Sequence, residues 1–205
     1  MGEKNGKEAE GLGARVERGR AALARHDVDA YEEAVALFQE ALEAEPRCAA
    51  ALAGLAEAYA YWGFRREIAG DRPEGAYLLA AERAAAALGL APDRAECHRA
   101  MAVAMRRGPK ADPGKRREEV LAAVDLDPED AENWFEYWHV RGYDPEDPCI
   151  GRVLALAPAH GGARIDLGAV LAERGELGGA ESQFRAALDV VPENCLARYD
   201  LAMVL

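Results

Sequence analysis

Aliphatic hydroxyl side chains are almost missing from this chain of 205 residues, which contains one serine, Ser182, and no threonine. The short motifs of common catalytic sites are missing too, since no Gly-x-Ser-x-Gly, P-loop or His-Glu-x-x-His sequence occurs. Ser182 lies between Glu181 and Gln183, a pattern typical of a solvated helix face. Catalysis needs a nucleophile beside a base, paired carboxylates in a cleft, or a metal. We therefore expect no catalytic residue, and a protein that is not an enzyme.

Closely spaced metal ligands are also absent from the sequence. The cysteines stand alone at Cys48, Cys97, Cys149 and Cys195, and the histidines stand alone at His26, His98, His139 and His160. Structural zinc sites normally draw on ligands paired within a few residues, such as Cys-x-x-Cys. We expect no metal, no cofactor, and reduced thiols in or near the helix packing.

Long hydrophobic runs are lacking as well. None approaches the roughly 18 residues of a membrane span, and the polar residues 1–10 contain no secretory signal. The net charge of −12 provides no basic face for nucleic acid or an anionic membrane. Arginine outnumbers lysine 21 to 4, which we interpret as the codon bias of a GC-rich bacterial genome. We expect a cytoplasmic protein that binds neither nucleic acid nor membrane.

What the sequence does contain is a repeat of helical segments rich in Leu, Val and Ala. Each segment ends at a proline, and successive prolines are 46, 36, 30 and 34 residues apart, at Pro46, Pro92, Pro128, Pro158 and Pro192. A period near 34 with two helical patterns inside each unit predicts stacked helix hairpins.

The clearest unit covers residues 161–194. Gly175 divides it, and its second half carries an apolar stripe of period 3.6, made of Leu177, Ala180, Phe184, Ala187, Leu188 and Val191. Small residues, including Gly168, allow two antiparallel helices to approach closely beside Phe184. Pro192 ends the second helix, and Asn194 is the expected N-cap of the next.

These small-residue positions, the aromatic in the second helix and the closing proline resemble the tetratricopeptide repeat (TPR) family. The resemblance implies an all-α, right-handed solenoid of antiparallel hairpins with about eleven helices. It divides the chain into a disordered stretch 1–10 and one solenoid 11–205, with repeats at about 11–46, 47–92, 93–128, 129–158 and 159–192 and a half-repeat at 193–205.

Three segments depart from the repeat pattern. Residues 64–77 are an insertion in the second repeat, either a loop or an extension of both flanking helices, and we favour the extension. The sequence Gly-Pro-Lys-Ala-Asp-Pro-Gly at 108–114 forbids a continuous helix. In the short fourth repeat, Trp134 fits a core position, whereas Trp138 replaces a small residue and is either packed or exposed for binding.

The resemblance also implies a concave groove lined by the first helix of each repeat. Its candidate partner-binding residues are Glu57, Tyr61, Arg99, Val103, Arg106, Arg107, Phe135, His139 and Ile165. Three arginines among them suit an acidic segment or a terminal carboxylate of a partner. The alternative is that Arg106 and Arg107 only satisfy carbonyls at a helix C-terminus.

The expected function is non-catalytic binding of a protein or peptide, as an adaptor or assembly factor. Two alternatives stay open: a self-associating scaffold, and an accessory domain of a larger enzyme or regulator. Apolar residues of the last segment, such as Met203 and Leu205, favour a homodimer through that helix, against a short helix lying on its own neighbour.

Overall fold

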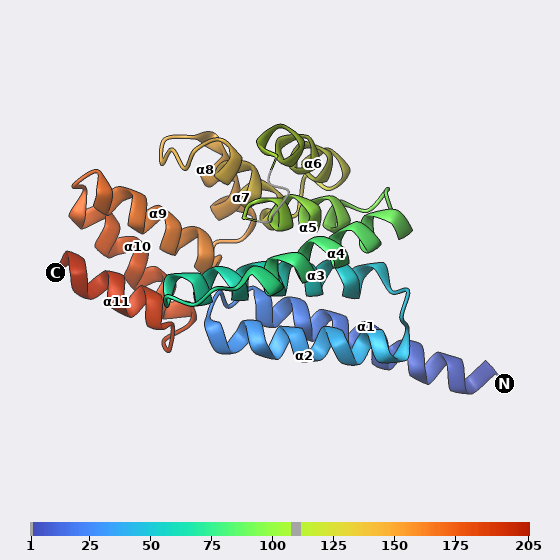
Figure 1. Ribbon diagram of the computed structural model, residues 1–205. Helices are drawn as coiled ribbons and strands as arrows, with labels where there is room; N and C mark the ends of the chain where they lie inside the picture. The colour runs from blue at the N-terminus through green and yellow to red at the C-terminus, as the bar shows by residue number, and fades with distance from the viewer. Residues whose placement is uncertain (1, 108–111) are drawn as a thin grey trace. The chain divides into compact units, whose positions relative to one another are not determined.

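The computed structural model describes residues 2–107 and 112–205, and over these residues it contains eleven α-helices and no strand (Figure 1). The chain divides into two compact units, one of residues 1–23 and 28–126, the other of residues 24–27 and 127–205. No helix in the described part of the chain is long and apolar enough to cross a membrane. The helix count and the all-α solenoid class agree with the sequence prediction.

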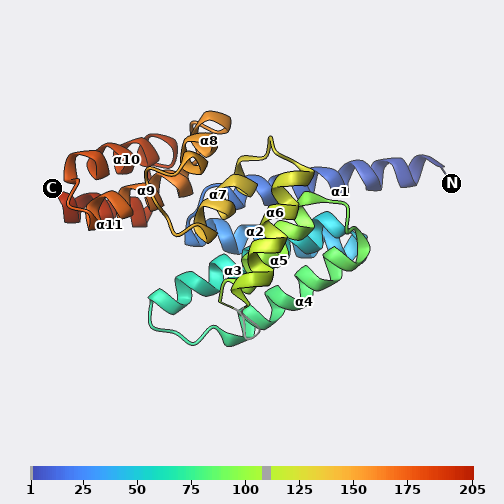
Figure 2. The ribbon, with the colours of Figure 1, turned by 90° about the horizontal axis from the view of Figure 1, so that it is seen from above.

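Unit 1 consists of three helix hairpins. In chain order its helices are α1 (Gly2–Leu23), α2 (Val28–Ala44), α3 (Ala49–Ile68), α4 (Glu74–Leu90), α5 (Ala95–Met105) and α6 (Pro113–Leu126). Each odd-numbered helix packs on the next even-numbered one, and the hairpins stack through α2 on α3 and through α4 and α3 on α5 (Figure 2).

Unit 2 holds the remaining five helices: α7 (Ala131–Val140), α8 (Pro148–Leu156), α9 (Gly161–Glu173), α10 (Leu177–Val190) and α11 (Cys195–Val204). Helices α7 and α8 form one hairpin, α9 and α10 form the next, and α11 packs on both α10 and α9. The Asn194 side chain accepts a hydrogen bond from the Ala197 N–H at 3.0 Å, which confirms the predicted N-cap.

All five closing prolines lie two residues beyond the end of a second helix. The helices concerned, α2, α4, α6, α8 and α10, end at Ala44, Leu90, Leu126, Leu156 and Val190. A proline lacks the N–H that a helix needs and disfavours helical backbone in the residue before it. The prolines therefore mark the ends of the second helices.

Glycines bring helices together at the predicted small residue Gly168 and at two further positions. A Cβ on Gly168 would lie 2.6 Å from the Phe184 ring, and one on Gly19 would lie 2.7 Å from the Phe38 ring. Gly54, which the sequence analysis did not single out, is closer still, at 2.2 Å from the same Phe38 ring. These distances leave no room for a side chain, so the aromatic rings rest directly on helix backbone.

The insertion at 64–77 extends both helices, as favoured. Helix α3 continues to Ile68, Gly70 turns the chain with φ of +90°, and α4 begins at Glu74. At the N-terminus, α1 begins at Gly2, within the stretch 1–10 for which the sequence analysis expected disorder. The Glu, Lys and Ala residues of that stretch favour a helix despite its lack of apolar pattern. Most of the 108–114 turn lies outside the described residues.

The alternatives for Trp138 are also decided. Its side chain is fully buried, and its indole N–H donates to the Asp144 carbonyl at 2.7 Å. Trp134 is half-buried and donates to the Pro128 carbonyl at 2.8 Å. Trp138 is therefore a packing residue and not an exposed binding residue.

Candidate functional site

Most of the nine residues predicted to line a groove are buried. Seven of them have exposed fractions of 8% or less: Glu57, Tyr61, Arg99, Val103, Phe135, His139 and Ile165. The sequence analysis expected these side chains to line an open groove. Within each unit, they instead contact other side chains of the same unit.

Arg99 shows this most clearly. Its Nε donates to the Glu57 carboxylate at 2.9 Å, and both side chains are 8% exposed. The expectation that Arg99 presents its guanidinium to a partner is therefore corrected, because α3 supplies the carboxylate that it binds. Such a buried pair holds α5 against α3 within unit 1.

The other buried candidates pack within their own units. The Tyr61 ring stacks on that of Tyr31 with centroids 5.6 Å apart. In unit 2, Phe135 lies 4.1 Å from the His139 ring, and Ile165 packs with Ala187 and Ala197. These contacts give each residue a structural role that explains its presence.

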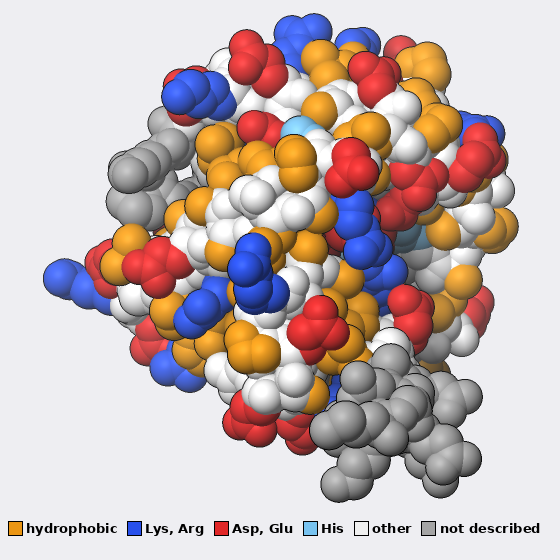
Figure 3. All heavy atoms as spheres, turned by 90° about the vertical axis from the view of Figure 1, so that its right-hand side faces the viewer, with side chains coloured by type: hydrophobic (Ala, Val, Ile, Leu, Met, Phe, Trp, Pro, Cys, Tyr) orange, Lys and Arg blue, Asp and Glu red, His pale blue; other side chains and the backbone are white. Residues whose placement is uncertain are grey.

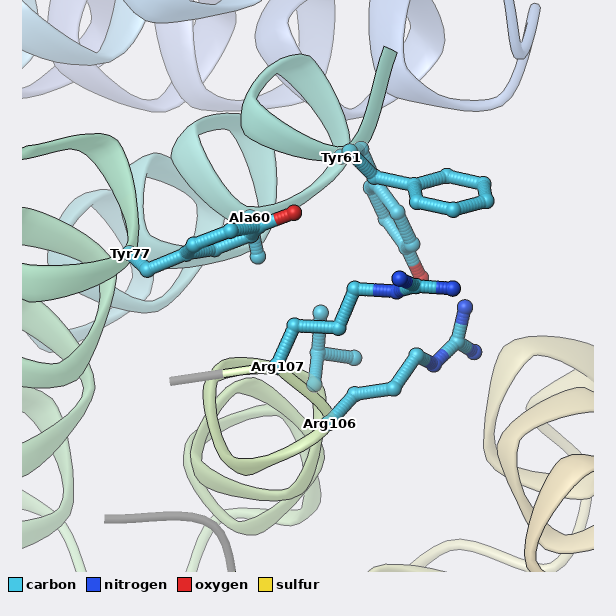
Figure 4. Close-up of a pocket in the computed structure, with 7 residues that line it drawn as sticks. Ala60, Tyr61, Tyr77, Arg106 and Arg107 are labelled. Carbon is cyan, nitrogen blue, oxygen red and sulfur yellow. The ribbon is translucent and has the colours of Figure 1, made fainter. Parts of the chain in front are cut away.

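Two candidates, Arg106 and Arg107, reach the surface of unit 1. Both extend from the end of α5 toward α3, where they line a small pocket with Ala60, Tyr61, Phe64, Tyr77 and Val103 (Figure 4). The Arg107 guanidinium carbon lies 4.4 Å from the centre of the Phe64 ring, a cation–π distance. Arg65 approaches the same ring at 5.8 Å. We call Phe64, Arg65, Arg106 and Arg107 the arginine patch.

One carboxylate belongs to this region. Glu67 lies 3.4 Å from Arg107 Nη1 and accepts a hydrogen bond from the Tyr77 hydroxyl at 2.5 Å. Burial and then the Glu67 hydrogen bond raise the pKa of Tyr77 well above its ordinary value, so its hydroxyl stays protonated as a donor. The Arg107–Glu67 pair is exposed by 44% and 43%, and such surface pairs contribute only about 0–1 kcal/mol.

The sequence analysis missed Phe64, Glu67 and Tyr77 because all three lie in the 64–77 insertion. Extension of both helices places them beside the end of α5. The signal available was the aromatic residue next to charged ones in Phe-Arg-Arg-Glu at 64–67.

Unit 2 has a surface depression whose charged side chains are mainly acidic, by contrast with the arginine patch of unit 1. It is lined by Tyr143, Val170 and the acidic Asp144, Asp166 and Glu173, with Arg174 donating to Asp144 at 2.9 Å. On the face shown in Figure 3, acidic, basic and hydrophobic side chains are intermixed. The net charge of −12 is therefore not gathered into one acidic area on that face.

Comparison with known proteins defines the fold. No family model matches the sequence, and no curated protein matches it either. Among solved structures, the chain is similar to TTC0263, a thermophilic TPR protein of Thermus thermophilus, with a TM-score of 0.66 and 19% identity over 96% of this chain and 98% of that one.

Two further structures are similar at lower scores. Cut9–Hcn1, an APC/C hetero-tetramer, gives a TM-score of 0.53 and 17% identity over 87% of this chain and 40% of that one. PilF of Pseudomonas aeruginosa gives a TM-score of 0.51 and 18% identity over 97% of this chain and 90% of that one. The chain has the fold of TPR proteins, as its sequence resemblance implied.

Proposed function

We propose that this chain is a protein-binding module that uses the arginine patch to hold an acidic segment of its partner. The observation that carries the proposal is the convergence of Arg106 and Arg107 beside the Phe64 ring at one edge of unit 1. Guanidinium groups bind carboxylates with paired hydrogen bonds, and an aromatic ring beneath them supplies apolar contact. Arginine and aromatic residues also dominate the energetics of measured interfaces.

The helix-end alternative explains less of the geometry. Arginines that only satisfy C-terminal carbonyls need no aromatic ring and no contact with another helix. Here Arg107 lies over Phe64 of α3 and beside Glu67 of the same helix. The role proposed is that of an adaptor or assembly factor in the cytoplasm, without catalysis.

The test is affinity capture from a lysate of the source organism, with wild-type protein and the variant Arg106→Glu/Arg107→Glu. We expect a partner that binds the wild type at low salt, is released as salt screens the charges, and is absent with the variant. The control is Arg18→Glu/Arg47→Glu, which makes the same change of charge at exposed positions outside the patch. Identical partners for all three proteins would contradict the proposal.

Self-association is a second candidate, and one observation favours it. Tyr199, Met203 and Leu205 at the C-terminal end of the chain are exposed by 63%, 69% and 77%. Apolar side chains clustered in this way form a surface that a second copy can cover. Multi-angle light scattering should give about twice the chain mass of 22.1 kDa, and Met203→Glu/Leu205→Glu should return the monomer. A monomer at high concentration would exclude the homodimer.

A further inference from the structure

Three of the four histidines, far apart in sequence, come together in unit 2. His26, His139 and His160 surround the Phe135 ring, with centroid distances of 5.9, 4.1 and 4.8 Å. All three are buried, with exposed fractions of 5%, 4% and 7%. His139 lies between Glu136 and Asp166, whereas the other two share a different carboxylate.

That carboxylate is Glu132, in the first turn of α7. Its Oε1 lies 3.2 Å from His160 Nε2 and 3.8 Å from His26 Nε2. One ligand atom from each of the three residues lies within 4.8 Å of the other two. The Glu132 carboxylate therefore lies between the two imidazoles.

The backbone around His26 adopts unfavourable conformations to place its ring there. His26 has φ of +51°, in the left-handed region that a non-glycine residue rarely enters. On the opposite side, a Cβ on Gly162 would lie 2.8 Å from three atoms of the His26 ring. Gly162 stands in the first turn of α9, where glycine weakens a helix relative to alanine. Both departures from local preference allow the two imidazoles to stack 5.3 Å apart.

We propose that His26, Glu132 and His160 form a binding site for a divalent transition-metal ion, best suited to Zn²⁺. Two imidazole nitrogens and one carboxylate oxygen are a ligand set that zinc accepts, whereas Mg²⁺ and Ca²⁺ prefer oxygen ligands throughout. Zinc bonds of roughly 2.0–2.1 Å in a tetrahedral site place neighbouring ligand atoms about 3.3 Å apart. The His160–Glu132 distance of 3.2 Å already meets this requirement. His26 Nε2 lies 3.8 Å from Glu132, and since the three ligand atoms lie within 4.8 Å of one another, His26 must move inward on metal binding. A water molecule completes the coordination.

The site has a specific energetic cost at His160. Its Nδ1 accepts a hydrogen bond from the Ala163 N–H at 3.1 Å and so caps α9. An accepting Nδ1 in a neutral imidazole places the proton on Nε2. Metal binding at Nε2 moves that proton to Nδ1, and the Ala163 N–H then loses its acceptor. Metal binding should therefore be coupled to a change at the N-terminus of α9.

This proposal reverses the expectation of no metal drawn from ligand spacing. Positions 26, 132 and 160 match no zinc motif, because the ligands come from the turn before α2, the start of α7 and the N-cap of α9. The proposed metal site shares no residue with the arginine patch, so each can fail without the other.

The test is titration of the full chain, stripped with chelator, with Zn²⁺ by calorimetry and with Co²⁺ by visible absorption. We expect one ion per chain and the strong absorption of tetrahedral Co²⁺. His26→Asn and Glu132→Gln should each weaken binding by at least about tenfold, the loss found even for outer partners of a metal site. His98→Asn is the matched control, because His98 pairs with Glu119 in unit 1 and should leave the affinity unchanged.

A second measurement keeps the proposal open to contradiction if a variant does not fold. In the wild-type protein labelled with ¹⁵N, Zn²⁺ should shift the amide resonance of Ala163 more than that of Ala197, which an asparagine caps in the same way. No binding, binding unaffected by His26→Asn and Glu132→Gln, equal loss with His98→Asn, or an unmoved Ala163 resonance would each overturn it.

Discussion

Units 1 and 2 are both made of helix hairpins, but they fill the space between helices differently. Unit 1 relies on alanine: α4, for example, buries Ala76, Ala80, Ala84 and Ala87 with only one larger residue, Tyr77. Unit 2 buries aromatic and polar side chains, among them Trp138, Asn133, Glu136 and His139. Alanine permits close approach and needs no hydrogen bond, whereas each buried polar group requires a partner.

The partners in unit 2 come from its own loops and helices. Asn133 donates to the Asp127 carbonyl at 2.9 Å, and His139 is bracketed by Glu136 at 3.2 Å and Asp166 at 3.1 Å. Unit 1 has a comparable buried polar contact in Glu57–Arg99. The following substitutions test whether close packing contributes more to stability in unit 1 and hydrogen bonding more in unit 2.

The largest expected effect on stability is at the buried Glu57–Arg99 pair of unit 1. Arg99→Met leaves the Glu57 carboxylate buried without its guanidinium, and breaking a buried pair in this way costs about 3–5 kcal/mol. Urea denaturation should show that loss in the free energy of unfolding. Arg99→Met combined with Glu57→Leu removes both charges and should recover most of it. A loss below about 1 kcal/mol for Arg99→Met alone, the level of a surface pair, would show that the pair is not important for stability.

Next in size is overpacking at Gly54. Gly54→Ala places a methyl group 2.2 Å from the Phe38 ring, and forcing extra atoms into a packed core costs about 1–3 kcal/mol. The double variant Gly54→Ala/Phe38→Leu should be less destabilised than the two single changes predict together. Gly89→Ala, in α4 with open space around the new Cβ, is the matched control and should not destabilise. If both glycine variants behave alike, close packing in unit 1 is not the cause.

In unit 2, the test removes a side-chain hydrogen bond at the start of α8. Asp147 accepts the Cys149 N–H at 2.8 Å, caps α8 and pairs with Arg141. Loss of such a cap in Asp147→Ala should cost about 1–2 kcal/mol at neutral pH. Asp189→Ala, an exposed position in α10, should cost little.

The same carboxyl sets a pH dependence. Burial raises the pKa of Asp147, but hydrogen bonds from Cys149 and Arg141 outweigh it and hold the pKa below its ordinary value. In the unfolded chain the pKa of an aspartate is about 3.9. Because the pKa of Asp147 is lower in the folded protein, its charged form stabilises the fold above a pH of about 3.9, and this stabilisation is lost as the pH falls. The difference in free energy of unfolding between wild type and Asp147→Ala should shrink as the pH falls from about 5 to about 3. If this difference in free energy stays constant with pH, the ionisation of Asp147 does not contribute, and the loss comes from the hydrogen bond alone.

The smallest expected effect is an increase in stability. Gly151 lies inside α8, and a Cβ there would meet nothing within 4 Å. Gly151→Ala should stabilise the protein by up to about 1 kcal/mol, because alanine loses less backbone freedom than glycine in a helix. Thermal unfolding followed by circular dichroism measures this gain, and Gly54→Ala in the same assay should give the opposite sign.

Much of the architecture follows from the sequence alone. The proline spacing and the apolar stripes determined the number of helices, their pairing, and local features such as the Asn194 cap. These features depend on interactions within a few residues or one helical turn, which sequence patterns record directly. The extension of α3 and α4 was favoured from the resemblance to other repeat arrays, and not from a local sequence pattern.

The sites were decided only by the tertiary structure. Whether Arg99 faces a partner or Glu57 depends on α3, 42 positions earlier in the chain. The approach of His26 to Glu132 and His160 depends on packing between segments more than 100 residues apart, for which the ligand spacing gave no signal. Periodicity fixes which face of a helix is apolar, but contacts with other helices determine which polar side chains on that face are already paired.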